Sequence, residues 1–325
     1  MSGAEYESEG APGDGCGRYA DDGIPADSPS VVQKRAGRNV TAEILSVTAY
    51  PVLLLSVFSV SVAALSLGWN PEWVSPIFLG GTILYLALLE RLIPYAREWH
   101  PRREEWRWYG VYFLLTMAGS GVAQWLVALV VGWIAPPEPG HRLWVEIPGA
   151  LLVGSLVSYL VHRLSHGNPV LWRLHGVHHV PDKVNVANNG VNHVLDIVLA
   201  QGLVQLSLAF MGFSRPALLV VGLFVAAQGY FVHANIDVGL GRLNHVLASP
   251  EQHRLHHSTD LSEAGHYGSD LSCWDHFFGS FTWRPGRAPE AVGLDTPSAF
   301  PGTGEILAGL LHPWRGRPAP DSGPN

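Results

Sequence analysis

Histidine is concentrated in about one third of this chain. Of the 16 histidines among its 325 residues, 13 fall between His162 and His276. Eight of them form three tightly spaced groups, which read His162-Arg-Leu-Ser-His166, His175-Gly-Val-His178-His179 and His253-Arg-Leu-His256-His257. On an α-helix, positions i, i+3 and i+4 lie on one face. We therefore expect each group to aim its imidazoles in one direction, as helices do when they present metal ligands.

The number and type of these side chains indicate a nitrogen-ligated metal site. Eight buried imidazoles without metal are unfavourable, because charged rings repel one another and neutral rings need hydrogen-bond partners. Imidazole suits Fe, Zn, Cu and Ni, so ligand type alone does not choose the metal. Eight ligands exceed what one tetrahedral zinc takes, which points to two ions or to one ion with many spectator histidines. No Glu-x-x-His pair lies inside the groups, which disfavours a carboxylate-bridged di-iron site.

The rest of the chain predicts an integral membrane protein that positions these groups. Hydrophobic residues make up 47% of the chain and charged residues only 14%, a balance typical of membrane proteins. Apolar stretches long enough to cross a bilayer are expected at about 44–68, 74–95 and 109–134, with a shorter one at 147–160. A further stretch, 194–235, is broken near 212–216 and predicts a hairpin of two spans. The predicted fold is all-α, with about six membrane-spanning helices and a helical cap that holds the histidines.

Charge and composition predict orientation and domains. Arginines are clustered between the second and third spans, which the positive-inside rule places in the cytoplasm, together with the histidine groups and both termini. We expect residues 1–40 to be a disordered acidic cytoplasmic tail, 41–290 the catalytic membrane domain, and 291–325 a loosely packed C-terminal tail. The two cysteines do not predict a disulfide framework. No basic run alternates with aromatic residues, so nucleic acid is not an expected partner.

At the level of motifs, the chain resembles the fatty acid hydroxylase/sterol desaturase superfamily. An HxxxH box, an HxxHH box and, after a membrane hairpin, a second HxxHH box form the signature of that superfamily. The surroundings are also similar to it over roughly residues 85 to 285. They include Tyr159-Leu-Val-His162-Arg163, Leu171-Trp172, His233-Ala-Asn235, Ser249-Pro250-Glu251-Gln252-His253, Tyr267-Gly268, Trp274-Asp275 and Leu89-Glu90-Arg91. The chain departs from many relatives in having His266 before Tyr267, and Val191-Asn-His193-Val194 where they have Arg-x-His-Pro.

The resemblance implies a membrane-bound, O2-dependent oxidoreductase that hydroxylates or desaturates a fatty acyl, sterol or related lipid. It implies a non-haem centre of two iron ions and, because no electron-transfer module is visible, a separate electron-donor protein. The implied metal ligands are His162, His166, His175, His178, His179, His233, His253, His256 and His257. The eight box histidines are also the implied catalytic residues. Residues that would orient the ligands from behind are His193, Asn235 and Asp275.

Other interpretations stay open at this point. The histidines can be ordinary polar residues near a membrane surface, although three groups at helical spacing disfavour this. A zinc-dependent membrane lipid hydrolase needs about three ligands and an open water position, which leaves five box histidines idle. A membrane haem-binding or metal-transport protein would carry its His pairs inside the spans. The lipid, the choice between hydroxylation and desaturation, and the oligomeric state do not follow from the sequence.

Overall fold

The fold is built from helices throughout the part of the chain that the structure describes. A computed structural model describes residues 39–136 and 141–315. Within these ranges there is no named strand, and only three isolated β-bridges pair extended segments. The long helices are α2 (Val40–Leu67), α3 (Pro71–Leu92), α4 (Glu105–Ile134), α5 (Leu143–Gly167), α7 (Val194–Phe210) and α8 (Arg215–Val232). Shorter helices are α6 (Pro169–His175), α9 (Pro250–His256), α10 (Cys273–Phe278) and α11 (Ile306–Leu311).

Five of the long helices are long and apolar enough to cross a membrane, namely α2, α3, α4, α5 and α8. The sixth apolar helix, α7, has only 17 residues, about 25 Å at 1.5 Å per residue. The multi-pass, all-α membrane class is therefore confirmed, with α7 as the short member. The fourth span expected at 147–160 is present but longer, because α5 has 25 residues and continues through His162 and His166.

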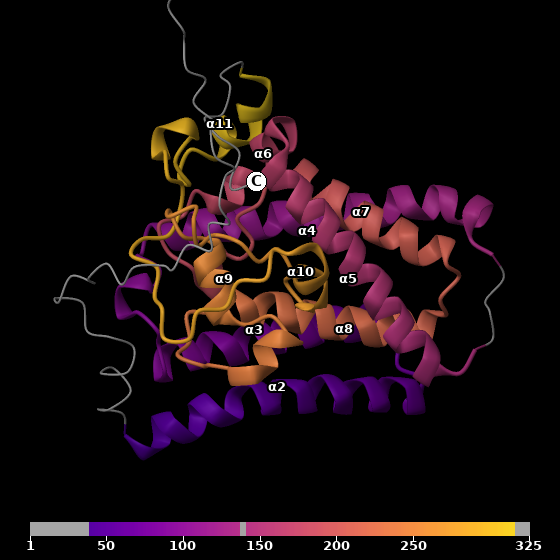
Figure 1. Ribbon diagram of the computed structural model, residues 1–325. Coiled ribbons are helices and arrows are strands. Elements are labelled where there is room, and N and C mark those ends of the chain that lie inside the picture. Colours follow the sequence, from indigo (N-terminus) through magenta and orange to yellow (C-terminus); the bar gives the residue numbers. More distant parts are fainter. Residues whose placement is uncertain (1–38, 137–140, 316–325) are drawn as a thin grey trace, which may run out of the picture.

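The helices lie side by side in two sets (Figure 1). α2 and α3 pack against α8, while α4 and α5 pack against α7. Tyr50, Leu53 and Phe231 are central to the apolar core of the first set, and the Tyr50 ring lies on the Phe231 ring. The termini of α2 follow elementary capping rules: Asn39 accepts the Ala42 N–H, and Gly68 ends the helix at φ 64°.

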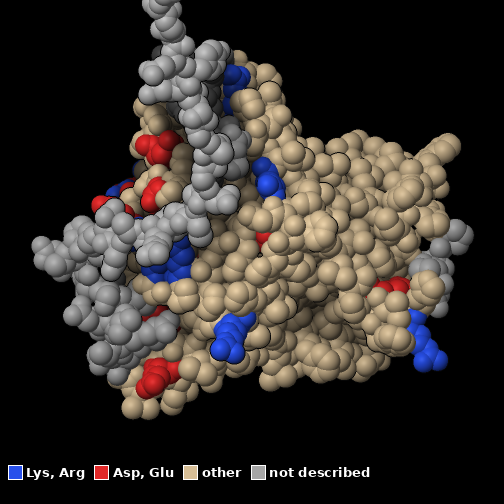
Figure 2. Space-filling model, viewed as in Figure 1, with Lys and Arg blue, Asp and Glu red and all other residues tan. Residues whose placement is uncertain are grey.

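Charged side chains avoid the broad flank of the molecule. Figure 2 shows a wide area with almost no charged residue, while charged residues gather toward the end that carries α6, α9 and α11 in Figure 1. Large apolar side chains such as Phe58, Leu84 and Leu114 are more than 60% exposed on the long helices. Exposed apolar surface of this extent requires a lipid environment, so this flank faces the hydrocarbon core.

The second and third histidine boxes lie in the cap at the charged end. The second box begins in α6 and continues in the 3-10 turn η2 (Gly176–His179), so it is not one regular α-helix. The third box occupies α9, which starts after Ser249; the Ser249 hydroxyl accepts the Gln252 N–H. The first box lies at the end of α5. Three boxes on three elements thus meet where the spans enter the cap.

The segment after residue 285 is more ordered than a loose surface tail. Val292, Leu294 and Phe300 are buried, and the Gly293 N–H donates to the His257 carbonyl. The Phe300 ring lies against Gly176, where an added Cβ would overlap it. The expectation of loose packing is wrong for these residues. Of the tail expected at residues 1–40, residues 1–38 lie outside the described residues, whereas Asn39 and Val40 begin α2.

Glu90 joins the end of α3 to the cap. Its side chain is 4% exposed, and one carboxylate oxygen accepts the Val186 and Asn235 N–H groups at 2.7 and 2.8 Å. Its own carbonyl accepts a hydrogen bond from the His100 ring. The Glu90 carboxylate is thus held by backbone N–H groups of two other segments. Through Glu90, α3 holds both the segment that carries Val186 and the segment that carries His233 and Asn235.

Removing the Glu90 carboxylate should destabilise the protein. Glu90→Ala leaves two buried N–H groups without an acceptor, so we expect a loss of about 2 to 4 kcal/mol. Glu90→Gln keeps an oxygen that can accept both bonds and should lose much less. Unfolding of the detergent-solubilised protein by heat measures the difference, with the exposed Glu72→Ala as control. Equal unfolding temperatures for Glu90→Ala and the control would contradict this role.

Candidate metal centre

Nine histidines converge into two groups in the cap. One group is His162, His166, His175, His179 and His256, and the other is His178, His233, His253 and His257. Within each group, one ring nitrogen of every member lies within 4.8 Å of the others. The groups adjoin, since the His179 and His257 rings stack with centroids 4.3 Å apart. The sequence predicted all nine residues as ligands, and the structure brings all nine together.

Each HxxHH box supplies both groups. In the second box, His175 and His179 belong to the five-histidine group and His178 to the four-histidine group. In the third box, His256 belongs to the five-histidine group, whereas His253 and His257 belong to the four-histidine group. The expectation that each box aims in one direction is therefore wrong for these two boxes. Positions i and i+4 are about 40° apart around a helix, whereas i+3 and i+4 are about 100° apart. Adjacent histidines thus point at neighbouring sites.

Hydrogen bonds from the Nδ1 atoms orient the rings. Nδ1 of His162 donates to the Tyr267 carbonyl at 2.6 Å. In the same way, Nδ1 of His178 donates to the Val191 carbonyl at 3.2 Å, and Nδ1 of His233 to the Asn185 carbonyl at 2.9 Å. Nδ1 of His175 lies 3.0 Å from the Asp196 carboxylate. When Nδ1 carries the proton, Nε2 presents a lone pair. Nε2 has no hydrogen-bond partner in His162, His166, His175, His179, His233 and His256.

Burial disfavours the charged form of His233 and of the three histidines of the third box. Burial lowers the pKa of His233 to about 4, and burial with neighbouring imidazoles holds the pKa of His253, His256 and His257 well below the ordinary value. Their neutral form is the one that ligates metals. Nε2 atoms of His253 and His257 lie 3.1 Å apart, an approach that a shared cation would stabilise. Unpartnered, inward-facing nitrogens fit two metal ions, one in each group.

Asp196 is a functional residue that the sequence analysis missed. It is buried in the first turn of α7 and contacts His175, the pairing that fixes a metal-bound imidazole in place. An acidic residue in the first turn of an otherwise apolar helix, three residues after His193, was the available signal. The 21 residues between His175 and Asp196 hid the contact, because only the packing of α6 on α7 brings them together.

The three residues expected behind the ligands lie at different places. Asp275 accepts the Tyr267 and Gly268 N–H groups and the Ser280 hydroxyl, so it shapes the turn whose carbonyl holds His162. Asn235 binds both the N–H and the carbonyl of Ala96. Neither contacts a ring of the nine histidines by a hydrogen bond that the structure records. Asp275 and Asn235 are thus not in direct contact with the candidate ligands, and they contact the backbone segments around them instead.

His193 lies outside both groups. It caps α7, with Nδ1 accepting the Leu195 N–H and Nε2 donating to the Leu310 carbonyl. Both ring nitrogens are used, so His193 ties α7 to α11. His266 is also outside, although it is buried and has a left-handed φ of 69°. That conformation favours Asn over most residues, the residue that the resembling family often has there.

A small cavity reaches the five-histidine group. It measures about 20 Å³ and is bordered by three of the histidines, by Trp172 and Ser258, and by Leu261, Ala264, Gly293, Leu294 and Asp295. The histidines are His166, His179 and His256. About one water molecule fits such a volume. Access for a larger molecule therefore requires residues 258–264 and 293–295 to move.

Breaking the Asp196 contact should weaken metal retention without unfolding the protein. Asp196→Asn keeps the shape of the side chain but removes the charge that favours the Nδ1–H form of His175. We expect metal affinity to fall about 10- to 100-fold. Titration of the metal-free protein with ferrous iron in competition with a chelator measures it, and the exposed Asp182→Asn serves as control. Unchanged affinity in Asp196→Asn would remove Asp196 from the centre.

Comparison with known proteins gives the same assignment as the motifs. Residues 147–280 match the fatty acid hydroxylase family model, and this range holds all nine histidines. Ornithine lipid hydroxylase OlsE of Rhizobium tropici is 29% identical over 74% of this chain and 73% of its own length. Alkylglycerol monooxygenase is 27% identical in Danio rerio over 48% of this chain, and 26% identical in Homo sapiens over 38%. These matches cover only 30% and 27% of the monooxygenases.

No solved structure matches the chain. The matched region contains two complete HxxHH boxes, the HxxxH box and His233, and its relatives are named as lipid hydroxylases and monooxygenases. These matches support the assignment of this chain to the fatty acid hydroxylase superfamily.

Proposed function

We propose that this protein hydroxylates a membrane lipid with O2 at a centre of two iron ions. The observation that carries the proposal is the convergence of nine imidazoles into groups of five and four, with unpartnered ring nitrogens facing inward. Two iron ions, when bound, would supply the binding and reductive activation of O2 that attack on an unactivated C–H bond requires. One turnover consumes O2, two electrons and two protons and yields an alcohol and water.

The protein's own residues have four tasks in this reaction. All nine histidines hold the ions, and the eight box histidines form the catalytic cluster. Asp196, Asn185, Val191 and Tyr267 orient four of the rings through Nδ1. The walls of the small cavity, among them Leu261 and Leu294, exclude water from the five-histidine group. The spans keep the site at the membrane, where an apolar substrate is concentrated.

Hydroxylation is favoured over desaturation by the relatives, which are named as a hydroxylase and monooxygenases. An ornithine lipid is the first substrate to test, because the relative named for it aligns over most of both chains. A zinc lipid hydrolase is disfavoured, since about three ligands suffice for it and nine converge here.

Two further parts of the proposal concern the surroundings of the enzyme. A separate protein donates the electrons. The histidine boxes and both termini face the cytoplasm, as the arginines that follow α3 support through the positive-inside rule. We place the catalytic domain at 41–290, although residues 292–300 pack against it.

Oxygen uptake tests the proposed function. Protein in lipid nanodiscs, loaded anaerobically with ferrous iron and supplied with a chemical reductant, should consume O2 and convert ornithine lipid to a product heavier by one oxygen atom. His178→Ala removes one nitrogen of the four-histidine group and should abolish turnover. His245→Ala, an exposed histidine outside both groups, should keep it. Hydrolysis of the lipid without O2 consumption in the zinc-loaded protein would contradict the proposal and favour the hydrolase.

A further inference from the structure

The connection between α3 and α4 is an exposed basic surface. Residues 91–107 contain five arginines and three glutamates, a net charge of +2 in a chain whose net charge is -7. All five arginines are exposed. Arg102 is paired with Glu104 and with the buried Glu105, which also pairs with Lys183. The arginines are Arg91, Arg97, Arg102, Arg103 and Arg107. We call residues 91–107 the arginine segment.

One route leads from this segment to the four-histidine group through Asn185. The Trp99 carbonyl accepts a hydrogen bond from the Asn185 side-chain amide at 2.9 Å. The Asn185 carbonyl in turn accepts Nδ1–H of His233 at 2.9 Å. Trp99 is only half-buried. Two hydrogen bonds thus connect a residue at the surface to a candidate ligand.

A second route passes through Tyr95 and Arg254. The Arg254 guanidinium lies 3.8 Å from the centroid of the Tyr95 ring, and Arg254 follows His253 directly in α9. The Tyr95 and Trp99 rings are neighbours, with centroids 5.5 Å apart. Both routes therefore begin in the same short stretch of the arginine segment, and both end at the four-histidine group.

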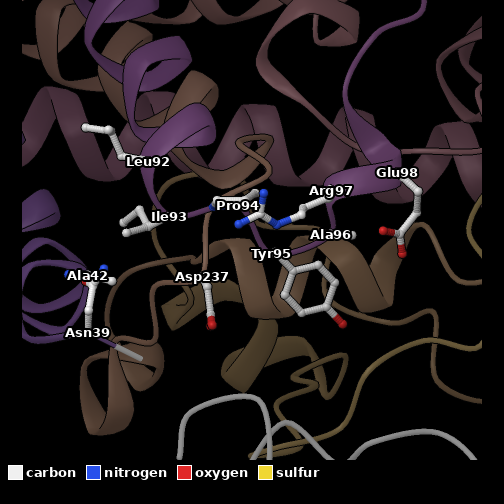
Figure 3. A pocket seen from close by; sticks show the side chains of 10 residues that line it. All are labelled: Asn39, Ala42, Leu92, Ile93, Pro94, Tyr95, Ala96, Arg97, Glu98 and Asp237. Atoms are coloured by element: carbon white, nitrogen blue, oxygen red, sulfur yellow. Dashed lines mark hydrogen bonds between the residues drawn. The ribbon is translucent and has the colours of Figure 1, made fainter. Parts of the chain in front are cut away.

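A recess of about 460 Å³ lies over this stretch. Figure 3 shows Tyr95, Arg97 and Glu98 along it, with Asp237 beside Tyr95. No histidine of either group borders the recess, so it is not the small cavity at the five-histidine group. The recess and the small cavity are thus separate features of the cap.

We propose that the arginine segment is the docking surface for an acidic one-electron carrier protein, and that electrons enter through the four-histidine group. This inference rests on the proposed function, in which two such carriers, each oxidised by one electron, supply the two electrons of a turnover. The basic segment complements an acidic partner. The two routes place the docked carrier next to the centre rather than at the far end of the spans.

The arginines also have a simpler explanation, which is the orientation of the chain in the membrane. Orientation is settled during insertion, so it has no effect on the encounter of purified protein with a soluble carrier. Measurements on full-length protein in nanodiscs therefore separate the two roles.

The test compares the wild type with Arg97→Glu/Arg103→Glu, using an acidic [2Fe–2S] ferredoxin as probe and basic cytochrome c as its charge-opposed counterpart. Ferredoxin should bind the wild type with an affinity that falls as salt rises, and the double variant about tenfold or more weakly. Reduction of the ferric protein by reduced ferredoxin should slow in parallel, while reduction by dithionite should not change. Arg142→Glu, an exposed reversal at the opposite end of the spans, should match the wild type.

Equal ferredoxin binding by the wild type and the double variant would overturn the inference and leave the arginines with orientation alone. Tighter binding of cytochrome c than of ferredoxin to the wild type would also overturn it. Lipid oxidation driven by dithionite tests the proposed function separately. If that oxidation occurs while ferredoxin reduction is insensitive to the reversals, the docking surface is wrong and the function stands.

Discussion

Nine imidazoles packed against one another in the interior are the constraint on which the cap depends. Each Nε2 lone pair that faces inward is an acceptor without a donor, and a buried acceptor without a partner is costly. Protonation does not relieve this cost, since burial and mutual repulsion lower the pKa of His256 and His257. Two cations, one in each group, would relieve it for the ligating rings. The metal ions would thus complete the folding of the cap as well as supply its chemistry.

The rest of the structure holds these rings in place from behind. Asp196, Asn185, Val191 and Tyr267 accept hydrogen bonds from Nδ1 atoms. Asn185 and Val191 lie in the connection before α7, Asp196 lies in α7, and Tyr267 lies between α9 and α10. Asp275 supports the Tyr267 turn, and Glu90 supports the segments that carry Asn185 and His233. Hydrogen bonds to backbone carbonyls need no particular side chain. The side chains that fix the structure of the cap are therefore a few buried carboxylates and amides.

Much of this arrangement was predictable because it is local. Apolar length predicts membrane helices, and i, i+3, i+4 spacing predicts metal ligands, so the class of fold and the eight box histidines follow from the sequence. The ninth, His233, was implied by the resemblance to the family. The division into groups of five and four did not follow, because it depends on where α5, α6, α8 and α9 meet. Asp196 and the burial of Leu294 and Phe300 are long-range contacts of the same kind. The hydrogen bonds of His193 likewise show that a motif position can serve to join two helices.

The two groups differ in their surroundings. The five-histidine group borders the small cavity, and the four-histidine group is linked through Asn185 and Arg254 to the arginine segment. The two groups thus border different parts of the described structure.

The central claim is that the nine histidines bind two ions, and iron counting tests it most directly. After anaerobic loading and removal of loosely bound metal, the wild type should hold about two irons per chain with nitrogen as the dominant neighbour in X-ray absorption. One tightly bound ion per chain, with the remaining histidines free, would contradict the account.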